Sequence, residues 1–185
     1  MSGTYAENGQ DYSAAAKWLH WIVAAIVITL IPVGVIMADL PEGSLQDWMF
    51  FFHESFGVTV LALMVVRLIQ RLRGAPPPYP TLTRTERILS IAVHRALYLL
   101  LFLAPLLGWL ALSAYGLGPA FFGLGKLPAL IGKDEPLSKI LFQLHGLVGF
   151  VIAGVVAIHI AGAFLHGFVK RDGLIFRMLP VSWRG

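Results

Sequence analysis

Cysteine is absent from this chain of 185 residues. Disulfide bonds and thiolate-bound iron–sulfur clusters are therefore excluded. The C-x-x-C-H motif that attaches c-type haem covalently is excluded as well. Any haem in this protein must be held without a covalent link to the chain.

Charged residues are also scarce. Asp, Glu, Lys and Arg make up 13% of the chain, whereas 57% is hydrophobic. A soluble domain of this size cannot bury so much apolar surface in one core, so lipid is expected to cover much of it. The net charge of +4 raises the alternative of nucleic-acid binding. The basic residues flank apolar runs and form no polar, aromatic-laced surface, so no nucleic acid is expected as a partner.

Four apolar runs are each long enough to cross about 30 Å of hydrocarbon as an α-helix. They cover approximately Trp18–Met37, Met49–Ile69, Ile88–Ala114 and Leu137–Val169. We therefore predict an all-α membrane protein, a bundle of four transmembrane helices forming one domain over residues 17–178. Polar tails, residues 1–16 and 179–185, flank this domain. The first run follows a tail with two acids and is too long for a secretory signal, so we interpret it as a helix of the mature protein.

The basic residues predict the orientation. Three lie around the connection between the third and fourth runs: Lys126, Lys133 and Lys139. The others lie in the tails or around the connection between the second and third runs: Lys17, Arg67, Arg71, Arg73, Arg84, Arg87, Arg95, Lys170, Arg171, Arg177 and Arg184. Lys and Arg accumulate on the cytoplasmic side, so we expect both termini to face the cytoplasm. The glycine-rich but apolar connection over residues 115–136 is expected to lie on the membrane interface.

Four histidines lie at or inside the apolar runs. His145 and His159 are fourteen residues apart in the fourth run, so they share a helix face at depths about 21 Å apart. Successive helices cross in opposite directions, which places His20 near His159 at the inner surface and His53 near His145 at the outer surface. Each couple presents imidazole nitrogens across a helix interface, where a macrocycle can take one axial ligand on each face. The spacing predicts two bis-histidine haem sites, one above the other.

Other residues repeat the same spacing. Arg67 is fourteen residues after His53, so we expect it at the level of the inner haem, where it could pair with a propionate. Gly34 is fourteen residues after His20 and should leave space at the outer level. Gly57 and Gly149 are expected to clear space beside a ring, because each follows a candidate ligand by four residues.

Each of these residues has a plainer interpretation. A histidine at a helix end commonly serves as an interfacial polar residue, which applies to His94, His166 and, taken alone, His20. Transmembrane glycines often mark helix packing, and Arg67 can snorkel to the boundary. Zinc favours a compact cluster with acidic or thiolate companions, and we expect no acid beside the four histidines. A haemless transporter using the histidines as proton sites would need intramembrane carboxylates, which we do not find.

The chain resembles the bacterial cytochrome b561 family of inner-membrane di-haem proteins from about Lys17 to Met178. The segments that carry the likeness are KWLHWIVA, FFHESFGVTVLALMVVRLIQRLRGAPPP, HRALYLLLFLAPLLGW and QLHGLVGFVIAGVVAIHIAGAFLHGFVKRDGLIFRMLP. The family's haem ligands match four positions here: His20, His53, His145 and His159. Members often have a second histidine directly after the one that matches His166, where this chain has Gly167.

The resemblance implies a multi-pass protein of the bacterial inner membrane that passes electrons through two b haems, commonly to or from ubiquinone. Some members are assigned as superoxide oxidases, so we expect a superoxide:ubiquinone oxidoreductase. His166 lies seven residues after His159, on nearly the same helix face, and could hydrogen-bond a quinone carbonyl or relay a proton. The alternative is a membrane-anchor subunit whose redox partner is a hydrogenase or dehydrogenase. The short loops and tails favour an independent protein.

Overall fold

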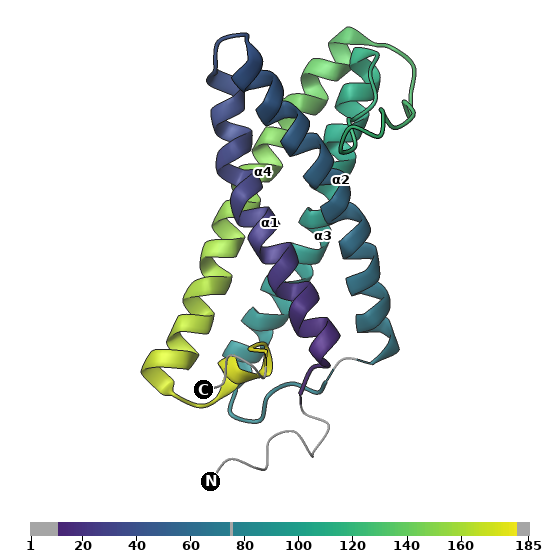
Figure 1. The fold of residues 1–185 in the computed structure, drawn as a ribbon. Helices are drawn as coiled ribbons and strands as arrows, with labels where there is room; N and C mark the ends of the chain where they lie inside the picture. The colour runs from purple at the N-terminus through teal and green to yellow at the C-terminus, as the bar shows by residue number, and fades with distance from the viewer. Residues whose placement is uncertain (1–10, 75, 181–185) are drawn as a thin grey trace.

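A computed structural model describes residues 11–74 and 76–180, and within these ranges the protein is helical, with no strand. The four main helices are α1 (Ala14–Asp39), α2 (Ser44–Arg73), α3 (Arg84–Tyr115) and α4 (Glu135–Phe164). A π-helical turn, η1 (Leu165–Lys170), continues α4, and a 3-10 turn, η2 (Leu174–Arg177), follows it (Figure 1). All four main helices are long and apolar enough to cross a membrane, which confirms the predicted fold class.

The helix ends are set by local hydrogen bonds. Thr83 caps α3 in a capping box, in which its hydroxyl accepts from the amide of Glu86 and the carboxylate of Glu86 accepts from the amide of Thr83. Gly116 ends α3 with a φ of 101°, a left-handed conformation that favours glycine. Asp134 caps α4 by accepting from the amide of Leu137 at 3.0 Å. These residues therefore fix where α3 begins and ends and where α4 begins.

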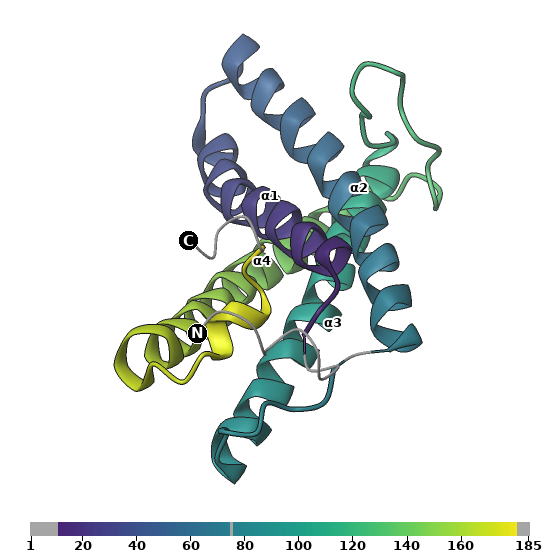
Figure 2. The same ribbon diagram turned by 60° about the horizontal axis from the view of Figure 1, so that its bottom comes forward.

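The helices form two hairpins that run side by side. The closest-packed pairs are α1 with α2 and α3 with α4, whereas the contacts between the hairpins are fewer. We call the end that carries Asp11, Gly74, residues 76–83 and residues 171–180 the terminal end, and the end that carries residues 40–43 and 116–134 the loop end. Figure 2 shows the helices spreading apart toward the terminal end. There the indole nitrogen of Trp21 donates to the carbonyl of Met178 at 2.9 Å and ties the C-terminal segment to α1.

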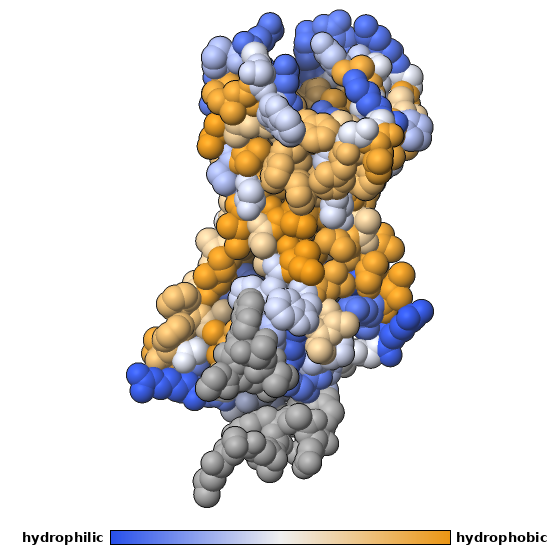
Figure 3. Space-filling model, viewed as in Figure 1, coloured by the Kyte–Doolittle hydropathy of each residue, from blue (hydrophilic) through white to orange (hydrophobic). Residues whose placement is uncertain are grey.

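The surface and the core both fit a lipid environment. On the face seen in Figure 3, an apolar belt covers the middle of the molecule between two hydrophilic ends. Large side chains on α4, such as Leu147 and Phe150, are 60% and 65% exposed, which lipid tails rather than water would cover. The buried apolar core is small and draws on all four helices: Val23, Val27, Val60, Met64, Ala104 and Ile152. The protein is thus a multi-pass membrane protein.

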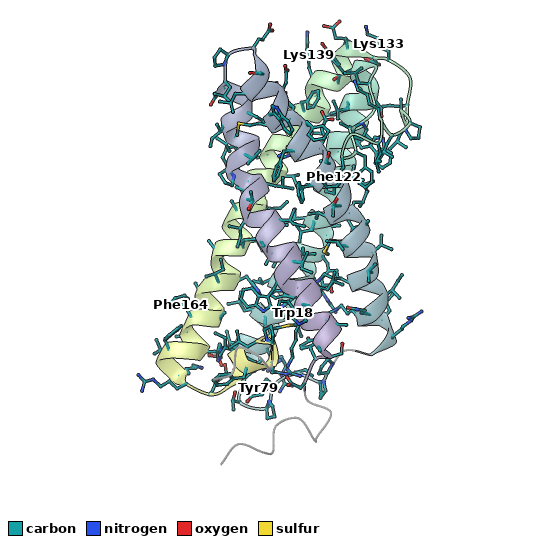
Figure 4. The ribbon with its side chains drawn as sticks, in the orientation of Figure 1. Trp18, Tyr79, Phe122, Lys133, Lys139 and Phe164 are labelled. Carbon is teal, nitrogen blue, oxygen red and sulfur yellow. The ribbon has the colours of Figure 1, made fainter. Side chains whose placement is uncertain are left out.

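The charged residues divide between the two ends. Lys133 and Lys139 project from the loop end, away from the belt (Figure 4). The basic residues that we assigned to the tails and the second connection lie in or near the terminal end, except Arg184, which lies outside the described residues. Which end faces the cytoplasm stays a prediction. The domain boundaries also stay predictions, since residues 1–10 and 181–185 lie outside the described ranges.

Candidate haem sites

Four histidines form two couples, and in each couple the two imidazole rings meet across a helix interface. His20 on α1 and His159 on α4 form the terminal-end couple, with ring centroids 6.1 Å apart and ring planes at 68°. His53 on α2 and His145 on α4 form the loop-end couple, with centroids 5.8 Å apart and planes at 82°. The structure therefore brings together the same histidines that we paired from their predicted depths in the membrane. Ile152 of the buried core lies seven residues from both α4 histidines, so packed apolar side chains separate the two couples.

The couples have the spacing that an iron atom between two imidazoles needs. Two metal–nitrogen bonds of about 2 Å, plus about 1.1 Å from each nitrogen to its ring centroid, place two centroids about 6 Å apart. The Nδ1 of His145 lies 2.9 Å from the carbonyl of Ala104. A carbonyl only accepts, so Nδ1 carries the proton and Nε2 keeps its lone pair for a metal. The Nδ1 of His53 is buried without a hydrogen-bond partner among the described residues. The residues present thus fit a bis-histidine haem at each couple.

Two glycines let the imidazoles of the loop-end couple sit against neighbouring helices. A Cβ on Gly34 would lie 3.0 Å from Cε1 of His53, and a Cβ on Gly108 would lie 3.2 Å from Cε1 and Nδ1 of His145. Gly34 was expected at this level, whereas Gly108 was missed. A Cβ on Gly57 or on Gly149 would meet no atom within 4 Å. The expected role of these last two beside a ring stays a prediction.

An acidic residue next to His53 in the sequence helps to attach the 116–134 connection to α2. Glu54 directly follows His53, and its carboxylate accepts from the amide of Ala120 at 2.7 Å. The hydroxyl of Ser55 also accepts from the amide of Phe122, at 3.0 Å. These bonds attach the 116–134 connection to α2 one residue from a candidate ligand.

His94 is a third histidine at the terminal-end couple. Its ring centroid lies 5.1 Å from that of His159, and its Nδ1 donates to the carbonyl of Ser90 at 2.6 Å. The structure thus places His94 inside the bundle, against the interfacial role that sequence reasoning gave it. A separation of 5.1 Å is shorter than the roughly 6 Å that an intervening metal requires. His20 is therefore the better partner for His159.

A cavity of about 350 Å³ opens beside the terminal-end couple. Its wall includes Arg67 and Arg71 from α2 and His94 and Tyr98 from α3. The two guanidinium carbons lie 6.0 and 5.4 Å from the ring centroid of Tyr98. Arg67 thus lies in one cavity wall with His94, whose ring meets that of His159, and its predicted pairing with a haem propionate stays a prediction. Sequence reasoning missed Arg71 and Tyr98, although each follows another wall residue by one helical turn.

His166 lies in η1 and is 6% exposed, so it is a buried residue rather than an interfacial one. Its Nδ1 lies 2.7 Å from Oδ2 of Asp172. Thr81 donates to the same carboxylate oxygen at 3.1 Å, and the hydroxyl of Tyr79 donates to the Asp172 carbonyl at 3.1 Å. Burial by itself would raise the pKa of Asp172, but hydrogen bonds to its carboxylate from His166 foremost, the amide of Leu174 and Thr81 hold it below its usual value. A histidine and an ionised carboxylate thus connect η1 to the polar surface of the terminal end.

Comparison with known proteins agrees with this geometry. The family model described as "Prokaryotic cytochrome b561" matches residues 11–181. The chain is 27% identical to "Cytochrome b561 homolog 2" of Escherichia coli, over 97% of this chain and 96% of that protein. It is 29% identical to "Probable superoxide oxidase CybB" of Yersinia pestis, over 92% of this chain and 97% of that protein. It is also 27% identical to "Cytochrome b561 homolog 1" of E. coli, over 91% of this chain and 97% of that protein.

The family match thus spans all four helices, both histidine couples and the η1 and η2 turns. Haem b binding, which the family implies, agrees with two couples whose spacing suits an iron atom. The chain therefore belongs to the prokaryotic cytochrome b561 family, as a multi-pass membrane cytochrome b.

Proposed function

We propose that this protein carries two b haems and transfers electrons from superoxide at the loop end to ubiquinone at the terminal end. The axial ligands would be His53 and His145 for the loop-end haem and His20 and His159 for the terminal-end haem. The observation that carries the proposal is the pair of facing couples, 5.8 and 6.1 Å between centroids, at opposite ends of one transmembrane bundle. The similarity to a probable superoxide oxidase supports the choice of electron donor.

The reaction balances as two one-electron oxidations and one two-electron reduction. Each superoxide loses one electron and leaves as dioxygen. Ubiquinone gains two electrons and two protons and leaves as ubiquinol. Bound haems supply reversible one-electron storage, and the protein sets access, orientation and potential.

At the loop end, the protein would attract the superoxide anion through individual lysines. Lys139 is paired with Glu135 at 3.4 Å, and Lys126 interacts electrostatically with Glu54. Lys133 would therefore contribute most to the attraction of superoxide. The attraction is local and modest, because the acids of this end outnumber its lysines: Asp39, Glu42, Asp47, Glu54, Asp134 and Glu135 against Lys126, Lys133 and Lys139.

At the terminal end, the protein must hold charge and deliver protons. Arg67 would pair with a haem propionate, since its guanidinium already acts on both histidines of that couple. His166 would hydrogen-bond a quinone carbonyl or pass it a proton, with Asp172 fixing which ring nitrogen carries the hydrogen. Thr81 and Tyr79 extend this pair toward the surface.

The cofactor assignment is tested by haem content. Purified protein should contain two low-spin b haems per chain. His53→Ala or His145→Ala should remove the loop-end haem and leave most of the other. One haem per chain, retained in all four single histidine variants, would refute the assignment.

The donor and acceptor are tested with the isolated protein. Superoxide and a ubiquinone analogue should yield reduced haem and then quinol. His166→Ala should slow quinol formation while haem reduction by superoxide proceeds. If the isolated chain forms no quinol but copurifies with a soluble dehydrogenase that reduces its haems, it is a membrane-anchor subunit instead.

A further inference from the structure

Two arginines line the cavity at the terminal end, and no described carboxylate forms an ion pair with either of them. Among the described residues, no carboxylate lies within 4.0 Å of the guanidinium of Arg67 or of Arg71. The acid in the cavity wall, Asp11, pairs with the buried ammonium of Lys17 at 2.9 Å. The cavity is therefore a positively charged space next to an apolar bundle, and such a space favours an anionic occupant.

The two arginines form a line that leads away from the terminal-end couple. Both arginines line the cavity together with His94, whose ring centroid lies 5.1 Å from that of His159, and Arg71 lies one turn after Arg67 toward the terminal end of α2. The face of Tyr98 carries both guanidiniums, at 6.0 and 5.4 Å. An aromatic face holds guanidinium groups by cation–π attraction and leaves their hydrogen-bond donors free to bind a carboxylate.

We propose that the cavity receives the two propionates of the terminal-end haem, with one propionate on Arg67, the other on Arg71, and Tyr98 positioning both guanidiniums. The inference rests on the proposed function, because it takes His20 and His159 as that haem's ligands. It adds Arg71 and Tyr98 as residues that determine the haem potential. Two cations match two carboxylates, whereas a neutral quinone ring has no need of a second arginine. The competing source of anionic oxygen is a phospholipid headgroup at the membrane surface.

A cation beside a haem stabilises the reduced form, because reduction adds negative charge. Arg71→Gln should therefore lower the potential of the terminal-end haem. We expect the equilibrium constant for haem reduction to fall several-fold and at most about tenfold. A tenfold change corresponds to about 59 mV for a one-electron couple. The loop-end haem should keep its potential. Arg73→Gln is the matched control, since Arg73 is exposed like Arg71 and lies two positions away on the same helix, but does not line the cavity.

Tyr98 variants separate positioning from folding. Tyr98→Leu removes the aromatic face and should lower the potential of the terminal-end haem. Tyr98→Phe keeps the aromatic face and should leave that potential at the wild-type value. Arg71→Lys keeps the charge but loses the planar guanidinium, so it should shift the haem potential much less than Arg71→Gln does. An unchanged loop-end haem spectrum in each variant shows that the bundle is folded.

Infrared difference spectra identify the occupant directly. Protein grown on a haem precursor that places ¹³C in the propionate carboxyls should show isotope-shifted carboxylate bands on reduction. Arg71→Gln and Arg71→Lys should change these bands, and Arg73→Gln should not. Potentials are also measured in nanodiscs of phosphatidylcholine alone and with added phosphatidylglycerol. If the Arg71 effect appears only with the anionic lipid and the labelled bands stay constant, a lipid headgroup occupies the cavity and the propionate assignment is wrong.

Failure of this inference is distinguishable from failure of the proposed function. If wild-type protein lacks a haem that depends on His20 and His159, the proposed function itself is wrong. If both haems are present but Arg71→Gln and Arg73→Gln leave the same potential, only the role of Arg71 is refuted.

Discussion

Gly34 is the position where the smallest change should have the most local effect. A Cβ there would lie 3.0 Å from Cε1 of His53. Carbon atoms prefer a separation of about 3.5–4.0 Å, so Gly34→Ala should push the imidazole by about 0.5 Å. Ligand distances in metal sites tolerate only about 0.2 Å, so this shift is large enough to weaken axial ligation. Overpacking of this kind costs about 1–3 kcal/mol, which corresponds to roughly a 5- to 150-fold loss of affinity.

The assay is the haem-to-chain ratio together with a spectral redox titration. Gly34→Ala should lower occupancy of the loop-end haem or convert it to a high-spin form, while the terminal-end haem keeps its content and potential. Gly154→Ala is the control, because Gly154 is exposed on α4 and a Cβ there would meet no atom within 4 Å. If both variants retain a normal loop-end haem, then His53 has room to move and the close approach of α1 has no bearing on ligation.

Three further outcomes are expected. Arg67→Ala should lower the potential of the terminal-end haem more than that of the loop-end haem, and equal changes in a redox titration would mean that Arg67 is an ordinary boundary residue. Haem reduction by superoxide should slow as ionic strength rises, and Lys133→Gln should weaken this dependence, because exposed charges are screened by salt; a salt-independent rate would argue against steering. Burial would raise the pKa of Asp172, but hydrogen bonds from His166, Leu174 and Thr81 hold it below its usual value. A depressed carboxyl pKa stabilises the fold above its unfolded value of about 3.9 and loses that effect as pH falls through the folded value. The hydrogen-exchange protection of residues 172–178, corrected for the intrinsic pH dependence of amide exchange, should therefore be steady from neutral pH to about pH 4 and fall below it, and Asp172→Asn should remove this acid-dependent step.

The attachment of the 116–134 connection shows how the loop end is ordered. Glu54 and Ser55 on α2 bind the backbone of Ala120 and Phe122, and the ring of Phe122 meets that of Phe56 with centroids 5.1 Å apart. This connection was expected on the membrane interface from its apolar composition. The structure adds that it is fixed to the helix that carries His53, so access to the loop-end couple is constrained by a defined segment.

The sequence by itself determined the four helices, their antiparallel order and the pairing of the histidines. These features follow from long apolar runs and from a fourteen-residue spacing, both of which are local properties of a regular helix. Because each run must cross the same thickness of hydrocarbon, position along a run becomes depth, and depth selects which histidines can meet. That reasoning also placed Gly34 beside His53 and Arg67 near His20 and His159.

Only the tertiary structure decided how the helix faces meet around each couple. His94 and His166 looked alike in sequence, as histidines near helix ends. Rotation of α3 turns His94 toward His159, whereas the π-helical turn after α4 lets His166 meet Asp172. Gly108, Arg71 and Tyr98 likewise depend on which side of α3 and α2 faces the bundle. Helix rotation is set by packing of all four helices at once, and the nearly uniform apolarity of a membrane helix leaves too weak a periodic pattern to predict it.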